Sequence, residues 1–353
     1  MRMRVGLLWH VLVLCAMGLA CLYSATHQRG AELVVRQMWW AALGCLAFVL
    51  VARIDFHRWL DAAYVCYAVT LVLLVAVLSV GRTTMGAARW LHIGAFSFQP
   101  AELAKLGTIL MLARYLGGTA GLARHLPWSR VIGALGLSAL PALLVFKEPD
   151  LGSATVFLAV ALGMLWVAGL RPRQGLTLAA LGLAVLPLAW HLLAPYQRTR
   201  LLVFMNPNVD PLGAGYTIIQ SQIAIGSGGL AGKGWLAGTQ NQLNFLPERH
   251  TDFIFSVLGE EWGFLGSVAV VGLLAGLVWR GFEIARQRQD RFGRLMATGV
   301  TMALGYQAAV NVGMVSGVLP VVGVPLPFLS YGGSSLVTTF IAVGLLENVR
   351  RWS

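Results

Sequence analysis

The chain alternates between long apolar runs and short polar segments. Ten of the runs are long enough to cross the hydrocarbon layer of a bilayer, which is about 30 Å thick. They predict ten transmembrane helices, of which the second is short and the fifth and sixth are separated only by a turn at Pro149. The runs are residues 5–24, 37–52, 62–80, 100–116, 131–146, 151–169, 176–193, 253–279, 295–318 and 325–346.

One polar segment is much longer than the others and lies between the seventh and eighth runs, at about 194–251. Within it, residues 216–225 carry an apolar stripe beside polar positions, which predicts a short helix lying on the membrane surface. Because helices satisfy their own backbone hydrogen bonds in lipid, the predicted fold is an all-α polytopic membrane protein. No linker divides the chain, so a single domain covering 1–353 is expected.

The composition supports a bilayer as the main solvent. Hydrophobic residues make up 58% of the chain and charged residues 11%, with a mean hydropathy of +0.73. A soluble domain usually carries about 25% charged residues. The net charge of +12 would suggest nucleic acid as the partner of a soluble protein, but here the basic residues lie mostly at the ends of apolar runs. That placement fixes membrane orientation, so no nucleic acid is expected.

The distribution of Lys and Arg predicts the orientation. With the N-terminus in the cytoplasm, about 16 basic residues fall inside against about 10 outside or embedded, and the densest cluster is 280–294. Ten spans then return the C-terminus to the cytoplasm and place the 194–251 loop outside. A cleaved signal peptide is the alternative for residues 1–24, but its apolar core is normally about 7–15 residues. An uncleaved first helix is therefore favoured.

No metal or nucleotide motif is apparent. The four cysteines, Cys15, Cys21, Cys45 and Cys66, lie in apolar runs without metal-ligand spacing and are interpreted as small apolar residues. The glycine-rich segment 226–234 resembles a phosphate-binding loop but departs from that motif at Ser227 and Gly234. It is either a flexible hinge or a set of backbone amides that meets a lipid-linked phosphate together with Lys233.

Charged residues inside apolar runs are candidates for function, because burying them is costly unless they are paired. Glu102 and Lys105 are three residues apart at the start of the fourth run and share one helix face. They form either a structural ion pair or a substrate site in which Glu102 holds Lys105 toward an anionic group.

Three acids lie near the start of the eighth run. Thr251 is predicted to cap this helix with Asp252 in its first turn, which makes Asp252 either a capping acid or a general base. A base would need its pKa raised by desolvation or by nearby carboxylates. Glu260 and Glu261 follow about 80° and 180° around the helix from Asp252, so at least one of them must face protein or a polar cavity.

Weaker features concern two other segments. Trp90 follows Arg89 before the fourth run and is typical of an interfacial anchor. Pro320, Pro325 and Pro327, with the glycine pair at 332–333, predict a broken start to the last span. Such irregular backbone usually lines a cavity when it lies at membrane depth.

Motifs along most of the chain, in order, resemble the SEDS family (shape, elongation, division and sporulation). Arg249 before His250, with the Asn311–Pro325 segment, favours the rod-shape members over the division members. Ala101 is a departure, since the family often has Ser there. The matching stretches are Arg89-Trp-Leu91, Phe98-Gln-Pro-Ala-Glu-Leu-Ala-Lys105, Glu148-Pro-Asp-Leu-Gly152, Asp210–Tyr216, Gln220–Gly229, Leu246–Phe255 and Leu329–Ser335.

The resemblance implies a peptidoglycan glycosyltransferase that polymerises lipid II at the outer face of the bacterial cytoplasmic membrane during elongation. It further implies a class B penicillin-binding protein as partner, together with other membrane proteins of the elongation machinery. The family's essential acid maps onto Asp252, and its important Glu and Lys map onto Glu102 and Lys105. Asp150 and Trp90 match further positions linked to activity.

The residues allow a mechanism of this kind. Asp252 would remove the proton of the attacking sugar hydroxyl, while a cation such as Lys105, Lys233 or the loop residue Arg249 stabilises the leaving diphosphate. Mg or Mn could assist as a divalent cation, although the sequence shows no dedicated metal site.

Two other classes of function compete with the enzyme. One is a lipid II flippase or other transporter, which would place its site near the bilayer midplane and often carries internal repeats. No clear repeat is visible, and Asp252 belongs at the outer surface. The other is a non-catalytic scaffold for a penicillin-binding protein, against which the costly embedded charges argue.

Overall fold

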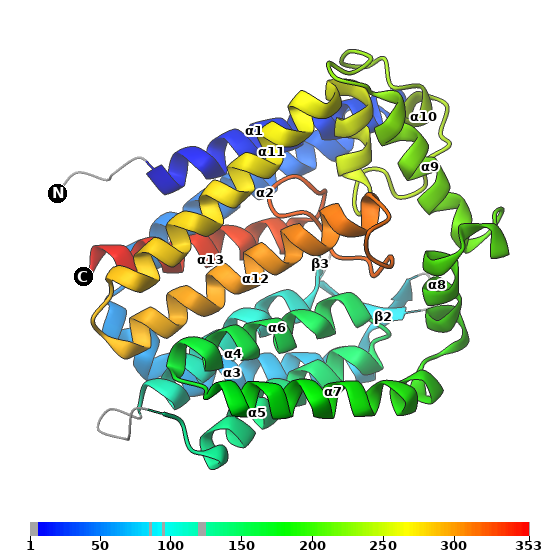
Figure 1. The fold of residues 1–353 in the computed structure, drawn as a ribbon. Coiled ribbons are helices and arrows are strands. Elements are labelled where there is room, and N and C mark those ends of the chain that lie inside the picture. The colour runs from blue at the N-terminus through cyan, green and yellow to red at the C-terminus, as the bar shows by residue number, and fades with distance from the viewer. Residues whose placement is uncertain (1–5, 85–86, 94–95, 119–124, 353) are drawn as a thin grey trace.

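The long helices run between two opposite ends of the molecule. In the computed structural model, which describes residues 6–84, 87–93, 96–118 and 125–352, the first and last described residues lie at one end, and the segment between α7 (Pro172–Leu192) and α11 (Ile254–Gln287) lies at the other (Figure 1). We call these the terminal end and the loop end. The helices are connected alternately at the two ends, as expected for a polytopic membrane protein.

Ten helices of 18 or more residues occur in the described part of the chain, each at a predicted position. Six of them, α1, α2, α3, α5, α6 and α11, are long and apolar enough to cross a membrane. The other four are α4, α7, α12 and α13, of which α4, α12 and α13 pack against one another in the bundle. The ten are α1 (Gly6–Thr26), α2 (Glu32–Arg53), α3 (Phe56–Val80), α4 (Pro100–Gly117), α5 (Trp128–Lys147), α6 (Leu151–Ala168), α7 (Pro172–Leu192), α11 (Ile254–Gln287), α12 (Arg291–Val315) and α13 (Gly333–Arg351).

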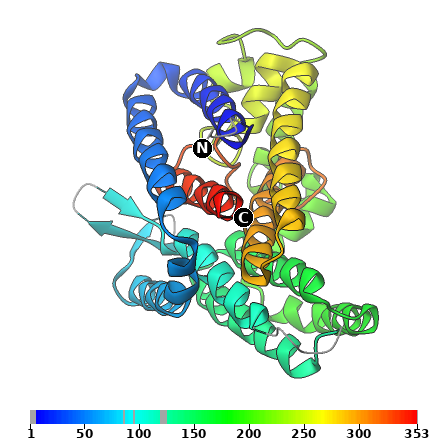
Figure 2. The same cartoon turned by 90° about the vertical axis from the view of Figure 1, so that its left-hand side faces the viewer.

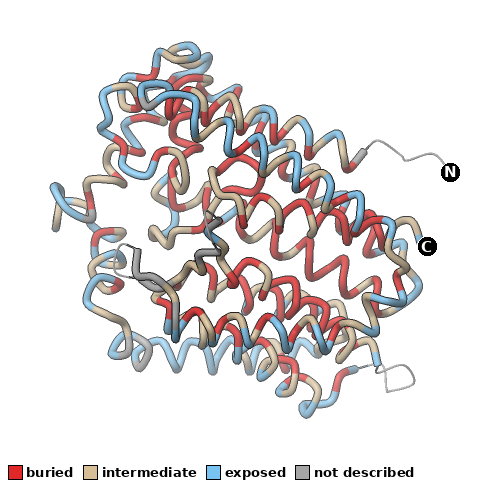
Figure 3. Tube along the Cα trace, turned by 180° about the vertical axis from the view of Figure 1, so that it is seen from behind, coloured by how far each residue is buried: buried red, intermediate tan, exposed pale blue. Residues whose placement is uncertain are grey.

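Large apolar side chains cover the outer faces of these helices. Trp39 is 73% exposed, Val72 67% and Trp279 76%. Buried residues concentrate on the central helices (Figure 3). A surface of this kind would aggregate in water and is suited to lipid.

The last helix lies at the centre of the bundle, where α2, α4, α11 and α12 pack against it (Figure 2). It begins at Gly333, so the prediction of a span starting at 325 was wrong. Pro325 and Pro327 lack the N–H that a helix needs, and residues 316–332 cross the loop end as irregular chain. The predicted broken start to this helix is confirmed.

A small antiparallel sheet connects α3 to α4 at the loop end. Its strands are β1 (Arg82–Thr84), β2 (Ala87–Ile93) and β3 (Phe96–Phe98), in the order β1-β2-β3. The expectation of an entirely helical chain missed it. Two of the strands have only three residues, and the seven residues of β2 do not alternate between apolar and polar, so the alternation by which a strand is recognised is missing.

The segment between α7 and α11 is mostly helical. It contains α8 (Pro195–Met205), a 3₁₀ turn η2 (Pro207–Val209), α9 (Ala214–Ser227) and the single turn α10 (Thr239–Gln242). A second 3₁₀ turn, η1 (His27–Arg29), follows α1. The helix predicted at 216–225 is confirmed as part of α9.

The glycine-rich segment after α9 packs against a break in α11. Gly263 has φ +66° inside that helix, and the freed amides of Phe264 and Leu265 donate to the carbonyls of Gly229 and Leu230 at 2.9 and 3.1 Å. At Gly232, with φ +82°, a Cβ atom would lie 2.1 Å from the Glu261 carbonyl oxygen. The amides of Gly232, Lys233 and Gly234 donate to the carbonyl oxygens of Gly228, Glu260 and Glu261 at 2.9, 3.0 and 3.0 Å. The segment is therefore not a free hinge, and these three amides are not open to a ligand.

Candidate active site

Asp252 lies in a turn just before α11, at the loop end. The helix begins at Ile254, so the prediction that Thr251 caps it was wrong. The Thr251 hydroxyl lies instead 3.2 Å from the carbonyl oxygen of Glu248. The interpretation of Asp252 as a residue of the first helical turn therefore fails.

Three hydrogen bonds hold the backbone of this turn. The Asn311 side-chain amide donates to the carbonyl oxygen of Asp252 at 3.0 Å, and the Ser330 hydroxyl donates to that of Thr251 at 2.7 Å. The Tyr331 amide donates to the carbonyl oxygen of His250 at 2.9 Å. Since Asn311 is on α12 and the other two donors precede α13, the end of the bundle core fixes the position of Asp252.

The side chain of Asp252 lines a cavity of about 220 Å³. Burial is the main reason that its pKa is raised to about 6, and the nearby carboxylates of Glu248 and Asp150 add to the increase, while Arg200 and Arg89 oppose it. A carboxylate with such a pKa is mostly ionised at neutral pH yet basic enough to take a proton in a transition state. The lining consists of Arg200, Val203, Thr217, Ile218, Pro247, Glu248, Asp252, Phe253 and Val321.

Asp150 is buried at the start of α6, close enough to Asp252 to affect its titration. Its carboxylate accepts a hydrogen bond from the Ser153 amide at 3.0 Å and one from the Gln99 side chain at 3.2 Å. Arg89 lies beside it and donates to the backbone carbonyl oxygens of Glu148 and Pro149. The predicted residue Asp150 thus belongs to the surroundings of Asp252.

Sequence reasoning did not single out Glu148 as a site residue. It is 1% exposed, and neither of its carboxyl oxygens has a hydrogen-bond partner among the described residues. Burial, and then the charge of Asp150, raises its pKa to about 8. Glu148 is therefore mainly protonated at neutral pH and adds little negative charge beside Asp150.

Glu102 and Lys105 form a buried ion pair in α4. The Lys105 Nζ and Glu102 Oε1 atoms are 2.8 Å apart, and the side chains of Lys105 and Glu102 are 4% and 3% exposed. The predicted pairing is confirmed, and it is compatible with both interpretations of these residues. Trp90 lies half-buried on β2, where its backbone pairs with Arg82 of β1.

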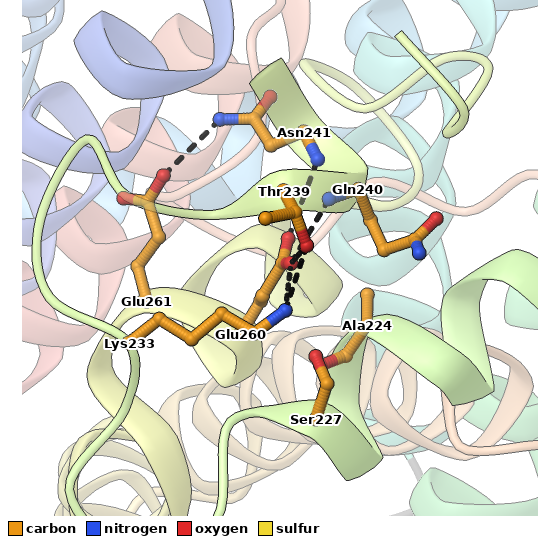
Figure 4. Close-up of polar contacts among 8 residues, drawn as sticks. All are labelled: Ala224, Ser227, Lys233, Thr239, Gln240, Asn241, Glu260 and Glu261. Carbon is orange, nitrogen blue, oxygen red and sulfur yellow. Dashed lines mark hydrogen bonds and ion pairs between the residues drawn. The ribbon is translucent and has the colours of Figure 1, made fainter. Parts of the chain in front are cut away.

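Lys233 belongs to a separate polar network, in which residues of the segment between α7 and α11 meet Glu260 and Glu261 of α11 (Figure 4). Its Nζ atom is 2.7 Å from Oε1 of Glu260, which is fully buried. The Thr239 hydroxyl and the Gln240 amide also donate to Oε1, and the Asn241 amide donates to Oε2. One buried carboxylate therefore holds Lys233 and the start of α10.

Glu261 and Arg249 extend this network to α1. Ser24 of α1 and the Asn241 side chain donate to Oε1 of Glu261. The Arg249 guanidinium donates to the carbonyl oxygens of Ala25 and Asn241 at 2.7 and 2.6 Å. Both acids thus face polar protein groups, and neither Lys233 nor Arg249 lines the cavity at Asp252.

Within the part of the chain that the structure describes, no group of three or more His, Cys, Asp or Glu residues is arranged to hold a metal ion. The Asp252 cavity itself is lined by the carboxylates of Asp252 and Glu248 and by the Arg200 guanidinium. This arrangement can remove a proton and stabilise an anion.

The whole chain is similar to known proteins of one kind. Residues 5–353 match the family model of the FtsW, RodA and SpoVE cell cycle proteins. The peptidoglycan glycosyltransferase MrdB of Escherichia coli K12 is 44% identical over 330 residues, covering 93% of this chain and 88% of that protein. Stage V sporulation protein E of Bacillus subtilis is 37% identical, covering 97% and 95%.

Solved structures show the same fold. A chain from a peptidoglycan synthase complex, described as coordinating polymerization and crosslinking, aligns with a TM-score of 0.85 at 38% identity, covering 98% of this chain and 97% of that one. The rod shape determining protein RodA of Thermus thermophilus aligns with a TM-score of 0.73 at 34% identity, covering 98% and 96%. This polytopic membrane protein belongs to the FtsW/RodA/SpoVE family, also called SEDS.

Proposed function

We propose that Asp252 is the general base through which this chain, a peptidoglycan glycosyltransferase, polymerises lipid II into glycan strands. Relatives named for that activity support the reaction class. The observation that carries the assignment of Asp252 is its carboxylate, with a pKa raised to about 6, in a cavity that Arg200 also lines.

The reaction uses Asp252 once in each cycle. The carboxylate takes the proton from the 4-hydroxyl of the acceptor sugar, and that oxygen forms a bond to the anomeric carbon of the donor sugar. The bond from this carbon to the diphosphate breaks, and its electron pair leaves with the polyprenyl diphosphate. Since diphosphate is a good leaving group when a cation stabilises it, a second catalytic acid is not required.

The proposed orientation places the terminal end in the cytoplasm and the loop end outside. Many arginines lie at or near the helix ends that form the terminal end of the molecule, namely Arg53, Arg114, Arg173 and those at 280–294. This agrees with the excess of positive charge on cytoplasmic segments. Arg2, Arg4 and Arg124, which also entered the prediction, lie outside the described residues. The Asp252 cavity would then open where lipid II is polymerised.

A class B penicillin-binding protein is the proposed partner, working with other membrane proteins of cell elongation. The similar chain in a complex that coordinates polymerization and crosslinking supports this proposal. The catalytic chain would supply the glycan strand and the partner would cross-link it. A Mg²⁺ or Mn²⁺ ion carried by the diphosphate is also part of the proposal, and an EDTA titration with metal add-back tests it.

Purified protein given lipid II, with and without the partner, tests the proposed function. The expected result is a glycan polymer that is resistant to SDS and cleaved by a muramidase. Liposomes containing the same protein test the flippase alternative through the accessibility of lipid II on the opposite leaflet. Lipid scrambling without any polymer would contradict the proposal.

A further inference from the structure

Two cavities meet at Arg200, on α8. One is the cavity at Asp252, and the other is a groove of about 280 Å³ between the start of α6, α8 and the end of α12. Arg200 and Val321 line both. A single guanidinium group therefore marks the border between the proposed catalytic cavity and a neighbouring groove.

The groove is built mainly of apolar side chains. They come from residues far apart in the chain, including Leu151, Leu201, Val310 and Leu319. An apolar groove at the level of the loop end, beside helices whose outer faces are apolar, is suited to a hydrocarbon chain. Arg200 lies at the edge of this apolar groove with a positive charge. A ligand that fits the groove should therefore combine a hydrocarbon chain with an anionic group at one end.

Within the described part of the chain, Arg200 lacks the carboxylate partner that holds each of the two lysines Lys105 and Lys233. Its guanidinium lies 5.8 Å from the centre of the Tyr196 ring and makes one long contact, 3.4 Å, to the Val321 carbonyl oxygen. In contrast, Lys105 and Lys233 lie within 2.8 Å of a carboxylate oxygen. Among the described residues, no ion pair within 4.0 Å joins Arg200 to a carboxylate.

We propose that Arg200 binds the diphosphate of the donor substrate, with the first isoprenoid units in the apolar groove and the sugar in the Asp252 cavity. The inference rests on the proposed function and names the cation that the reaction requires. The fork of guanidinium N–H groups matches two diphosphate oxygens, which a single ammonium group does not.

The position of Arg200 serves the bond-breaking step. The electron pair of the bond between the anomeric carbon and oxygen moves onto the diphosphate, and the new negative charge develops beside the guanidinium. The acceptor oxygen attacks the same carbon from the side of Asp252, which keeps the proton. Arg200 thus stabilises the leaving group, while Asp252 activates the nucleophile.

Kinetics of Arg200→Gln and Arg200→Lys, with Arg36→Gln as control, test this role. Arg36 is another exposed arginine of the loop end, paired with Glu32 at 2.6 Å and remote in sequence from both cavities. We expect Arg200→Gln to lower kcat/KM for lipid II about 100-fold, as for removal of one group that stabilises a developing anion. Arg200→Lys should retain an intermediate rate, and the control should stay close to the parent.

Binding of farnesyl diphosphate and of farnesol to the detergent-solubilised proteins is measured directly. The comparison distinguishes a loss of diphosphate recognition from a loss of folding, because a misfolded protein would bind neither compound. The parent and Asp252→Asn proteins should prefer the diphosphate by at least about tenfold, while Arg200→Gln should bind both compounds alike. Filling the groove with Leu201→Trp should weaken binding of both.

Unchanged kcat/KM and unchanged diphosphate preference in Arg200→Gln would overturn the proposal even if the parent protein polymerises lipid II. Failure of the parent to polymerise, with Arg200-dependent diphosphate binding intact, would instead contradict the proposed function and leave the binding site standing.

Discussion

At the residue scale, Asp252 is defined by neighbours that no local sequence pattern connects. Glu248 precedes it by four residues, but Asp150, Arg89 and Arg200 come from three other parts of the chain. The sequence pointed to Asp252 through the family motif and left open whether it was a cap or a base. Only the packing of β2, the start of α6 and α8 shows which charges surround it.

The pH dependence of catalysis follows from this environment. A general base must be ionised, so kcat/KM should fall as the pH drops through about 6, the pKa of Asp252. The negative charge of Glu248 disfavours ionisation of Asp252. We therefore expect Glu248→Gln to shift the acidic limb of the profile to lower pH, and Arg200→Gln to shift it to higher pH.

Profiles of kcat/KM against pH for these variants, with Glu32→Gln as control, check the prediction. Glu32 is an exposed acid that pairs with Arg36, and its substitution should leave the profile in place. If the acidic limb of Glu248→Gln lies at the same pH as that of the parent, or at a higher pH, the result would contradict the electrostatic account.

At the scale of elements, α11 depends on the loop that precedes it. The sequence predicted that at least one of Glu260 and Glu261 faces protein or a polar cavity, because adjacent residues lie about 100° apart around a helix and a charge that faces lipid is costly. Their partners could not be predicted, since Lys233 and Asn241 lie in the loop and Ser24 lies on α1. The break at Gly263 was not predicted either. The amides of Phe264 and Leu265 that it frees donate to carbonyl oxygens of the loop that are distant in sequence.

The ion pair between Lys233 and Glu260 should show an asymmetric response to substitution. Lys233→Met leaves a fully buried carboxylate without its cation, which should cost about 3 kcal/mol of unfolding free energy. Glu260→Gln should cost less, because the Lys233 side chain is 27% exposed and can reach water.

The double variant Lys233→Met/Glu260→Gln should recover part of the loss, since removing both charges leaves neither unpaired. Unfolding titrations with SDS in mixed micelles measure all three free energies. A Lys233→Met protein as stable as the parent would show that the pair does not hold the loop.

At the scale of the whole molecule, hydropathy predicted the positions of all ten long helices and of the segment between α7 and α11. It could not place the small sheet, whose short strands carry no periodic signal. It also started the last helix too early, because apolar residues before Gly333 form irregular chain instead of a helix. Burial in the bundle core, and not contact with lipid, explains the apolar character of that chain.

Single cysteines test the orientation that places the active site outside. In a background lacking Cys15, Cys21, Cys45 and Cys66, we introduce Leu212→Cys at the loop end or Gln289→Cys at the terminal end. Leu212 is 90% exposed, and Gln289 lies between α11 and α12.

A membrane-impermeant maleimide should label intact spheroplasts of the Leu212→Cys strain. It should label Gln289→Cys only after the membrane is permeabilised. The opposite pattern would place the Asp252 cavity in the cytoplasm and contradict the proposed site of polymerisation.

The most direct test of the central claim is the initial rate of glycan polymerisation from lipid II by purified parent and Asp252→Asn proteins. The substitution keeps the size of the side chain and removes its basicity. We predict a rate about 10²- to 10⁴-fold lower, with unfolding behaviour and farnesyl diphosphate binding like those of the parent. Polymerisation by Asp252→Asn at the rate of the parent would contradict the assignment of Asp252 as the general base.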